Sequence, residues 1–389
     1  MRALRRPPLR VWIWTAATVV VAVVAALLWR GSDAAATEHT TAAATPAPSG
    51  APGDQLTQSW SADAALLPLP VVESGRVITG SAHGIRALDP ATGQEAWHYT
   101  RSNAHLCGLT AVDENVVAVY RTADRCDEVV ALAADTGVYA WTRSVDFSSD
   151  VTLTSTSGIV LATSRTGVVT IDPIGDNIRW RYSTPAGCRL TGTAAGSAGV
   201  AVLQECAGST AAQLRLLDGF TGQPHWTRDV APRDGGDVAL AGADGLLTVL
   251  VGNSLQALSR TDGSVVATVP LPDGSAADVP AATPLEGTVA DVVLVWARGI
   301  LVALSPSSGS VLWQQPSLGL PLVRVDPKDA VPTTALPVPE TGGFVRRDVR
   351  TGAELGRSTV DGDLPDGGVS QQVGSAVVYA LPGRVLGYR

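Results

Sequence analysis

The chain has 389 residues, of which 45% are hydrophobic and 16% charged, and its formal net charge is −8. A chain this apolar can bury a substantial core, which excludes global disorder, and its acidic balance argues against a nucleic-acid-binding protein. With 40 Gly and 25 Pro, tight turns must be frequent. The aromatic residues comprise 10 Trp against 6 Tyr and 3 Phe, so one structural role of tryptophan is repeated many times.

The N-terminal residues have the pattern of a membrane anchor. A basic stretch, residues 1–10, precedes an uncharged apolar run at residues 11–29. At about 1.5 Å per residue, a helix over this run is about 28 Å long, close to the ~30 Å hydrocarbon thickness. The arginines before the run predict a cytoplasmic N-terminus, and therefore a single-pass type II protein in the cell membrane. The alternative is a cleaved signal peptide and a secreted protein; both interpretations export the residues that follow.

Residues 30–53 are rich in Ala, Thr, Pro and Ser and have no apolar periodicity. Such a segment buries too little apolar surface to offset the entropy of ordering it. We therefore expect a flexible linker between the anchor and residues 54–389.

Residues 54–389 repeat one unit. Its clearest copy runs from Ala87 to Trp97 (ALDPATGQEAW) and contains an alternating strand, a turn and a returning strand that carries the tryptophan. In the turn, Asp can accept backbone N–H bonds, and Gly supplies a positive φ. The positions equivalent to Trp97 recur about every 43 residues, a period typical of β-propeller blades. We assign these turn positions: Asp89, Gly93, Gly137, Asp172, Asp218, Gly222, Gly263, Gly309, Asp348 and Gly352.

Each unit is predicted to be a four-stranded antiparallel blade whose tryptophan covers the junction with the next blade. The docking tryptophans are Trp60, Trp97, Trp141, Trp180, Trp226 and Trp313. Residues 369–389 contain inner strands without a Trp strand, whereas residues 54–62 contain a Trp strand with nothing before it. We therefore predict an all-β, eight-bladed propeller in which residues 54–62 complete the last blade and close the ring. Seven blades are the alternative, because residues 319–345 are irregular and rich in Pro. Trp296, outside the anchor and docking sets, is expected in inter-blade packing; a ligand surface is the alternative.

The four cysteines indicate an oxidising compartment. Three pairings are arithmetically available, and the position of each cysteine in its repeat favours Cys107–Cys126 and Cys188–Cys206. Metal binding is the rival interpretation, but the chain has no C-x-x-C motif and its five histidines lack the spacing of metal ligands.

The string from Ala87 to Trp97 resembles the tryptophan-docking motif of the pyrroloquinoline-quinone (PQQ) repeat propellers, and the resemblance covers about residues 54–389. One branch of that family is the quinoprotein dehydrogenases, which bind PQQ and calcium over the channel. The other consists of cofactor-free scaffolds, similar to the outer-membrane assembly factor B lipoprotein, and of membrane-anchored actinobacterial proteins. This chain lacks both the adjacent Cys-Cys pair of the dehydrogenases and the lipid-anchored cysteine of the assembly factor. The resemblance therefore implies the fold, and neither activity.

No catalytic or metal-binding set stands out in the sequence. The acidic stretches Asp361–Asp366 and Asp234–Asp237 resemble calcium loops but are more typical of turns between blades, and the scattered histidines are expected on strand surfaces. We expect a non-catalytic binding or scaffolding module in the cell envelope, with no cofactor and no nucleic acid, contacting envelope proteins or a small ligand at the propeller faces. The alternatives are a PQQ- or metal-dependent oxidoreductase and an extracellular ligand sensor.

Overall fold

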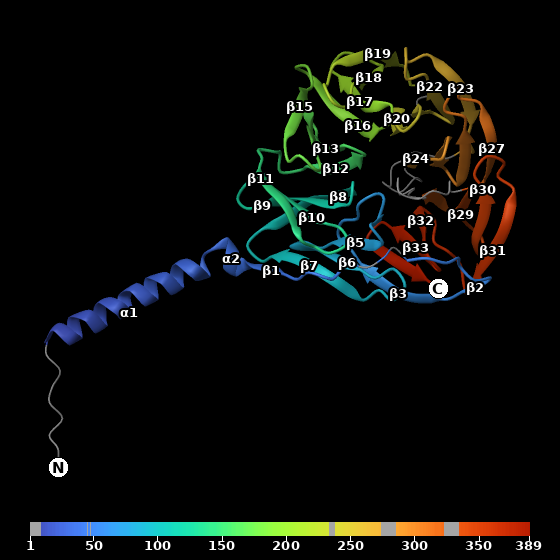
Figure 1. The fold of residues 1–389 in the computed structure, drawn as a ribbon. Helices are drawn as coiled ribbons and strands as arrows, with labels where there is room; N and C mark the ends of the chain where they lie inside the picture. The colour runs from blue at the N-terminus through green and yellow to red at the C-terminus, as the bar shows by residue number, and fades with distance from the viewer. Residues whose placement is uncertain (1–8, 45, 47, 233–237, 274–284, 323–333) are drawn as a thin grey trace.

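The computed structural model describes all residues except 1–8, 45, 47, 233–237, 274–284 and 323–333. Its β-sheets form a closed ring around a central axis (Figure 1), an eight-bladed β-propeller. Within most blades the first strand in the sequence lies innermost, and the following strands lie progressively outward in antiparallel order. The predicted eight blades are therefore confirmed, and the seven-bladed alternative is wrong.

The first four blades follow the chain from residue 72 to residue 230. Blade 1 contains β4 (Val72–Glu73), β5 (Arg76–Gly80), β6 (Gly84–Leu88) and β7 (Glu95–Arg101); blade 2 contains β8 (His105–Val112), β9 (Asn115–Arg121), β10 (Cys126–Ala133) and β11 (Tyr139–Ser144). Blade 3 contains β12 (Thr152–Thr156), β13 (Ile159–Ser164), β14 (Gly167–Ile171) and β15 (Ile178–Ser183); blade 4 contains β16 (Cys188–Gly196), β17 (Gly199–Cys206), β18 (Ala212–Leu217) and β19 (Pro224–Val230).

The last four blades complete the ring. Blade 5 contains β20 (Val238–Gly242), β21 (Leu247–Val251), β22 (Ser254–Leu258) and β23 (Val265–Pro270); blade 6 contains β24 (Leu285–Val289), β25 (Val292–Ala297), β26 (Ile300–Leu304) and β27 (Val311–Pro316). Blade 7 contains β29 (Ala335–Glu340), β30 (Gly343–Asp348) and β31 (Glu354–Val360); blade 8 contains β32 (Gly368–Val373), β33 (Ala376–Leu381), β34 (Arg384–Tyr388) and β3 (Gln58–Asp63).

The ring closes where the two ends of the propeller domain meet. β3 pairs antiparallel with β34, and the backbones of Thr57 and Arg389 exchange hydrogen bonds of 2.9 and 3.0 Å. The N-terminal Trp strand is therefore the outer strand of blade 8, as the sequence predicts. Such closure joins the first and last blades and leaves no open end to the array.

Blade 7 departs from the repeat at both edges. β28 (Gly319–Leu322) pairs in parallel with β32 of blade 8, and β2 (Gln55–Leu56) pairs in parallel with β31 at the outer edge. The irregular stretch at residues 319–345 thus begins with a strand that pairs with the next blade, β28, and ends in β29 and the start of β30, which pair with each other within blade 7, whereas residues 323–333 lie outside the described residues.

The N-terminal segment differs in one respect from expectation. The apolar helix α1 (Leu9–Arg30) is long and apolar enough to cross a membrane and buries no residue against the propeller. Residues expected to be a flexible linker instead include the short helix α2 (Asp33–Ala36) and strand β1 (Thr37–His39), which pairs with β7 of blade 1. Composition misleads here because backbone hydrogen bonds to an existing sheet edge order a strand without an apolar pattern of its own.

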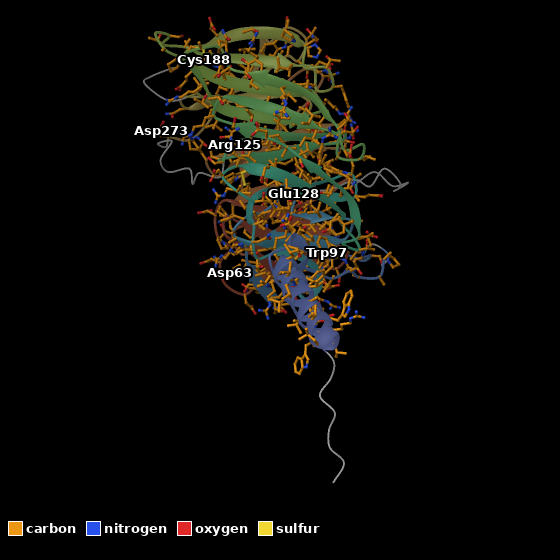
Figure 2. The ribbon with its side chains drawn as sticks, turned by 90° about the vertical axis from the view of Figure 1, so that its left-hand side faces the viewer. Asp63, Trp97, Arg125, Glu128, Cys188 and Asp273 are labelled. Carbon is orange, nitrogen blue, oxygen red and sulfur yellow. A yellow bond between two sulfur atoms is a disulfide. The ribbon has the colours of Figure 1, made fainter. Side chains whose placement is uncertain are left out.

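The blades present two faces that differ in their connections. The face that we call the turn face carries the hairpins between first and second strands and between third and fourth strands. The opposite face, here the disulfide face, carries the connections between second and third strands and between successive blades. Figure 2, an edge-on view, shows Cys188, Arg125 and Asp273 toward the same side of the ring, the disulfide face.

Candidate functional site

The predicted docking tryptophans lie between blades. Each indole N–H donates to a backbone carbonyl in the third-to-fourth-strand turn of the next blade; Trp97 donates to Ala134 O at 3.0 Å and Trp141 to Pro173 O at 2.8 Å. The same bond joins Trp60 to Pro90, Trp180 to Gly219, Trp226 to Arg260 and Trp313 to Val349. Trp97 is fully buried, so this junction removes a large apolar ring from water while its one polar atom stays bonded.

The turn glycines are required for two reasons. Gly137 has φ +75°, and a Cβ placed on it would lie 2.7 Å from the ring of Trp97. Gly93 stands in the same relation to Trp60, and Gly222 to Trp180. Because only glycine combines this backbone conformation with so close an approach, the Thr-Gly signature records the docking of the previous blade's tryptophan.

Three junctions depart from this pattern. In blade 3 the non-glycine residue Asp176 takes the turn position with φ 57°, one residue after Gly175. In blade 5 the tryptophan position is Ala267, and Val266 packs against Gly309 instead. The third departure is the junction of blades 7 and 8, where blade 7 has Gly356 at the tryptophan position. In blade 8 the third and fourth strands, β34 and β3, come from opposite ends of the domain, so they share no turn on which a tryptophan could dock.

The turn aspartates act as predicted from the repeat. The carboxylate of Asp218 accepts bonds from the amide and hydroxyl of Thr221 at 2.7 and 2.8 Å, and these bonds hold its pKa below the ordinary value. Asp348 and Thr351 repeat the arrangement, and the pKa of Asp348 is lowered by the same kind of bonds. Asp89 accepts from Thr92, and Asp172 from the amides of residues 174 and 175.

Both predicted disulfides form on the disulfide face. Cys188 and Cys206 are direct cross-strand partners on β16 and β17. Cys107 and Cys126 instead join the first strand of blade 2 to the start of its third strand, with Cα atoms 6.2 Å apart. The pairing is confirmed, although the two bridges are not geometrically equivalent. Trp296 is buried at 4% exposure, donates to Ser317 O and lies in one apolar cluster with Leu336 and Val338 of blade 7, which confirms its assignment to inter-blade packing.

The innermost strands enclose a central channel with a cavity of about 250 Å³. Its described walls combine apolar side chains with hydroxyls, an amide and carboxylates, contributed by residues from around the ring: Val112, Ser155, Glu286, Thr288, Leu320 and Gln371 among them. None of these residues is a predicted site residue, because single polar positions inside apolar strands form no motif.

The most polar part of the channel wall is a network that joins blades 4, 5 and 6. Asp244 accepts from Ser197 N at 3.1 Å and from Thr288 N at 2.9 Å. Glu286 accepts from Asp244 N at 2.6 Å and from the hydroxyl of Thr248. Burial raises the pKa of Glu286 to about 8, with the nearby Asp244 charge adding to the shift and the two hydrogen bonds opposing it. Each carboxylate is thus already occupied in joining blades.

The described part of the channel wall does not supply the groups expected to bind PQQ with calcium. PQQ is an anionic carboxylate-bearing quinone, yet the described residues that line the cavity include Asp244 and no Arg or Lys. Calcium requires six or more oxygen ligands, and the described residues contain no group of three or more His, Cys, Asp or Glu side chains placed to hold a metal ion. Of the two acidic stretches, Asp361–Asp366 connects β31 to β32 with Leu364 buried, whereas residues 234–237 lie outside the described residues.

Two larger clefts open on the disulfide face. The first, of about 560 Å³, lies between blades 2 and 3 and is lined by charged and hydroxyl side chains that include Arg125, Asp146, Ser149 and Arg181. The second, of about 540 Å³, lies beside the Cys188–Cys206 bridge and is lined by Arg189, Glu205 and Thr210 among others. Both are more than twice the volume of the channel cavity, and disulfide bridges secure the loops at both.

Comparison with known proteins identifies the family but no specific activity. Residues 40–202, 166–345 and 210–380 match the family described as outer membrane protein assembly factor BamB. None of the curated proteins matches the chain in sequence.

Solved structures of the same fold come from proteins with different roles. The crystal structure of BamB from Moraxella catarrhalis aligns with TM-score 0.50 and 19% identity, covering 86% of this chain and 99% of that chain. The computationally designed protein Ika8 aligns with TM-score 0.53 and 15% identity, with the same coverages of 86% and 99%. At these identities the likeness shows the fold alone, whereas the family match spans most of the sequence. The chain belongs to the family of the outer membrane protein assembly factor BamB.

Proposed function

We propose that the propeller is a binding and scaffolding module outside the cytoplasm, held at a membrane by α1, and that it binds partners through its disulfide face. The observation that carries this proposal is the pair of clefts of about 560 and 540 Å³ on that face. The name of the matching family, an assembly factor, supports a role in binding other proteins.

The chemistry of the clefts favours a polar partner. In the first cleft Arg125 pairs with Asp146 at 2.7 Å while both side chains stay largely exposed, so an incoming charged group can exchange with either. In the second, Arg189 pairs with Glu205 at 2.8 Å across exposed strand ends. Mixed charges and hydroxyls suit a hydrated protein surface better than an apolar ligand.

The location outside the cytoplasm rests on two features of the chain. α1 has the length and composition to cross a membrane, and the described cysteines are all paired in disulfides, which persist in oxidising compartments. An N-terminus in the cytoplasm and a propeller on the other side satisfy both.

Site-specific photocrosslinking in intact cells tests the face used. A photoreactive residue in place of Ser149 or Thr210, in the two clefts, is expected to yield defined protein adducts. Matched controls replace Gln94 or Asn177, which are exposed in turns of the opposite face. Adducts from the controls alone, or from none of the four, would contradict the proposal.

A second measurement addresses the dehydrogenase alternative. The purified chain is heated with and without PQQ plus calcium, and we expect its unfolding temperature to be unchanged. A clear increase would favour the oxidoreductase, because a ligand that binds only the folded state raises its stability.

A further inference from the structure

The segment that follows the apolar helix is fastened to the outer rim of the propeller. β1 pairs with β7 in the register Thr37 to Arg101 and His39 to Tyr99. Hydrogen bonds continue the pairing on both sides, from Ser102 N to Ala36 O at 2.9 Å and from Thr40 N to His98 O at 2.9 Å. Blade 1 therefore has a fifth strand, supplied by residues next to the anchor.

A buried arginine with two carboxylate partners reinforces this docking. Arg101 is 1% exposed, and its guanidinium lies 2.6 Å from Glu128 Oε2 of blade 2 and 2.9 Å from Asp33 Oδ1 of α2. Asn103 also donates to Asp33 Oδ1, at 2.7 Å. Because a buried guanidinium is costly unless it is paired, the contact with Asp33 favours the docked position of α2.

The segment also reaches the second blade. His39 Nε2 donates to Gly137 O at 2.7 Å, and its ring packs edge-on against Tyr99 and Tyr139, with centroids 5.6 and 4.9 Å away. Ala42 N then donates to Thr136 O at 2.9 Å. The segment is thus bonded to two blades, one of them at the turn against which Trp97 packs.

Very little chain separates the helix from its docking site. Only Gly31 and Ser32 lie between α1 and α2. Gly31 N donates to Leu27 O at 3.1 Å, the Ser32 hydroxyl donates to Trp29 O at 2.7 Å, and Ser32 Oγ accepts from Ala35 N at 3.3 Å. This junction continues the hydrogen bonding of the helix directly into the docked segment.

We propose that residues 31–42 are a rigid coupling that holds the ring edge-on to the membrane. Figures 1 and 2 both place α1 at the rim of the ring, at blade 1, and over neither face. With α1 across the bilayer, the channel axis runs along the membrane surface and the disulfide face opens sideways. The kind of partner that this placement fits is a protein standing beside the propeller on the same membrane.

This inference rests on α1 crossing a membrane, as in the proposed function, but not on binding at the clefts. The test uses the full chain in lipid nanodiscs and measures amide hydrogen exchange. We expect the amides of Thr40, Ala42 and Ser102 to exchange about 100-fold more slowly than unstructured peptide. The double variant Thr40→Pro/Ala42→Pro removes two backbone N–H donors of the docked segment and leaves the propeller sequence unchanged. In this variant the amide of Ser102 should lose its protection from hydrogen exchange. The matched control is Ala43→Pro, at an exposed position beyond the last of these bonds, and it should keep the protection.

A distance measurement tests orientation independently. Spin labels on cysteines introduced at Leu28, in α1, and Thr261, an exposed residue in a turn of blade 5, should give one narrow distance distribution. The double variant should broaden it, and Ala43→Pro should not. A broad distribution in the parent chain, or exchange of Thr40 and Ala42 at the rate of free peptide, would overturn the coupling. Either result would leave the photocrosslinking test of the clefts intact.

Discussion

The contact between Trp97 and Gly137 permits a quantitative test of why the repeat signature contains glycine. Alanine at position 137 would meet two penalties: a backbone at φ +75° and a Cβ 2.7 Å from the indole ring. The first costs about 1–2 kcal/mol for an L-residue, and the second about 1–3 kcal/mol as overpacking. We therefore expect Gly137→Ala to lower the free energy of unfolding by about 2–5 kcal/mol.

The two penalties separate in a double-mutant cycle. Trp97→Ala alone should cost about 3–5 kcal/mol for the lost ring, plus about 1 kcal/mol for the unpaired Ala134 carbonyl. In that background the overlap is gone, so Gly137→Ala should cost only the backbone penalty. The coupling energy is then about 1–3 kcal/mol. Gly208→Ala is the control, since Gly208 has φ +84° and a Cβ added there would have nothing within 4 Å.

Urea unfolding followed by far-UV circular dichroism measures all four corners of the cycle without relying on tryptophan emission. If Gly137→Ala costs no more than Gly208→Ala, the ring contact does not explain the glycine. Equal costs of Gly137→Ala with and without Trp97 would refute the reasoning in the same way.

Three further predictions use the same unfolding assay. Replacing both Cys188 and Cys206 by Ala should cost about 3 kcal/mol, as for a loop of 18 residues, and reductant should erase the difference from the parent; a cost near zero would contradict the disulfide's role. The folded pKa of Glu286 is about 8 against an ordinary 4.5, so between these pH values the folded state holds a proton that the unfolded state has lost. Glu286 therefore destabilises the fold increasingly as pH rises from 4.5, and the effect is complete above pH 8. Glu286→Gln should flatten the dependence of stability on pH over that range, and an unchanged slope would refute the assignment. The lowered pKa of Asp218 stabilises the fold above pH ~4, and this stabilisation is lost as pH falls further. Asp218→Asn should therefore lower the free energy of unfolding by about 1 kcal/mol at neutral pH and by little in acid. A pH-independent loss would contradict this account.

Sequence patterns reveal the propeller because its periodic contacts each need a particular residue type. The Thr-Gly turn and the tryptophan four residues later identify the third and fourth strands, and the contact of Trp97 with Gly137 explains why both residues recur. The closure by β3 is equally predictable, since an outer strand without inner strands can only complete a blade that lacks one.

The channel and the docked segment are less predictable for physical reasons. Glu286 and Asp244 lie at blade junctions, and the backbone donors that hold them come from residues more than 40 positions away. β1 is ordered mainly by main-chain bonds to β7, which leave little trace in side-chain type. The segment's side-chain contacts to the propeller, such as those of Asp33, His39 and Thr40, come from residues that form no motif in the sequence.

The docked segment changes how the scaffold must act. A free linker would let the ring sample many orientations, and binding a partner would then carry the entropic cost of fixing one of them. Residues 31–42 already fix the orientation within the folded chain, through bonds to blades 1 and 2 and the contacts of Arg101 with Asp33 and Glu128. In the proposed coupling, the two disulfide-secured clefts are held in one orientation relative to the membrane. The proposal therefore implies that preorganisation favours binding to a neighbouring membrane protein, whereas a freely diffusing partner gains nothing from it.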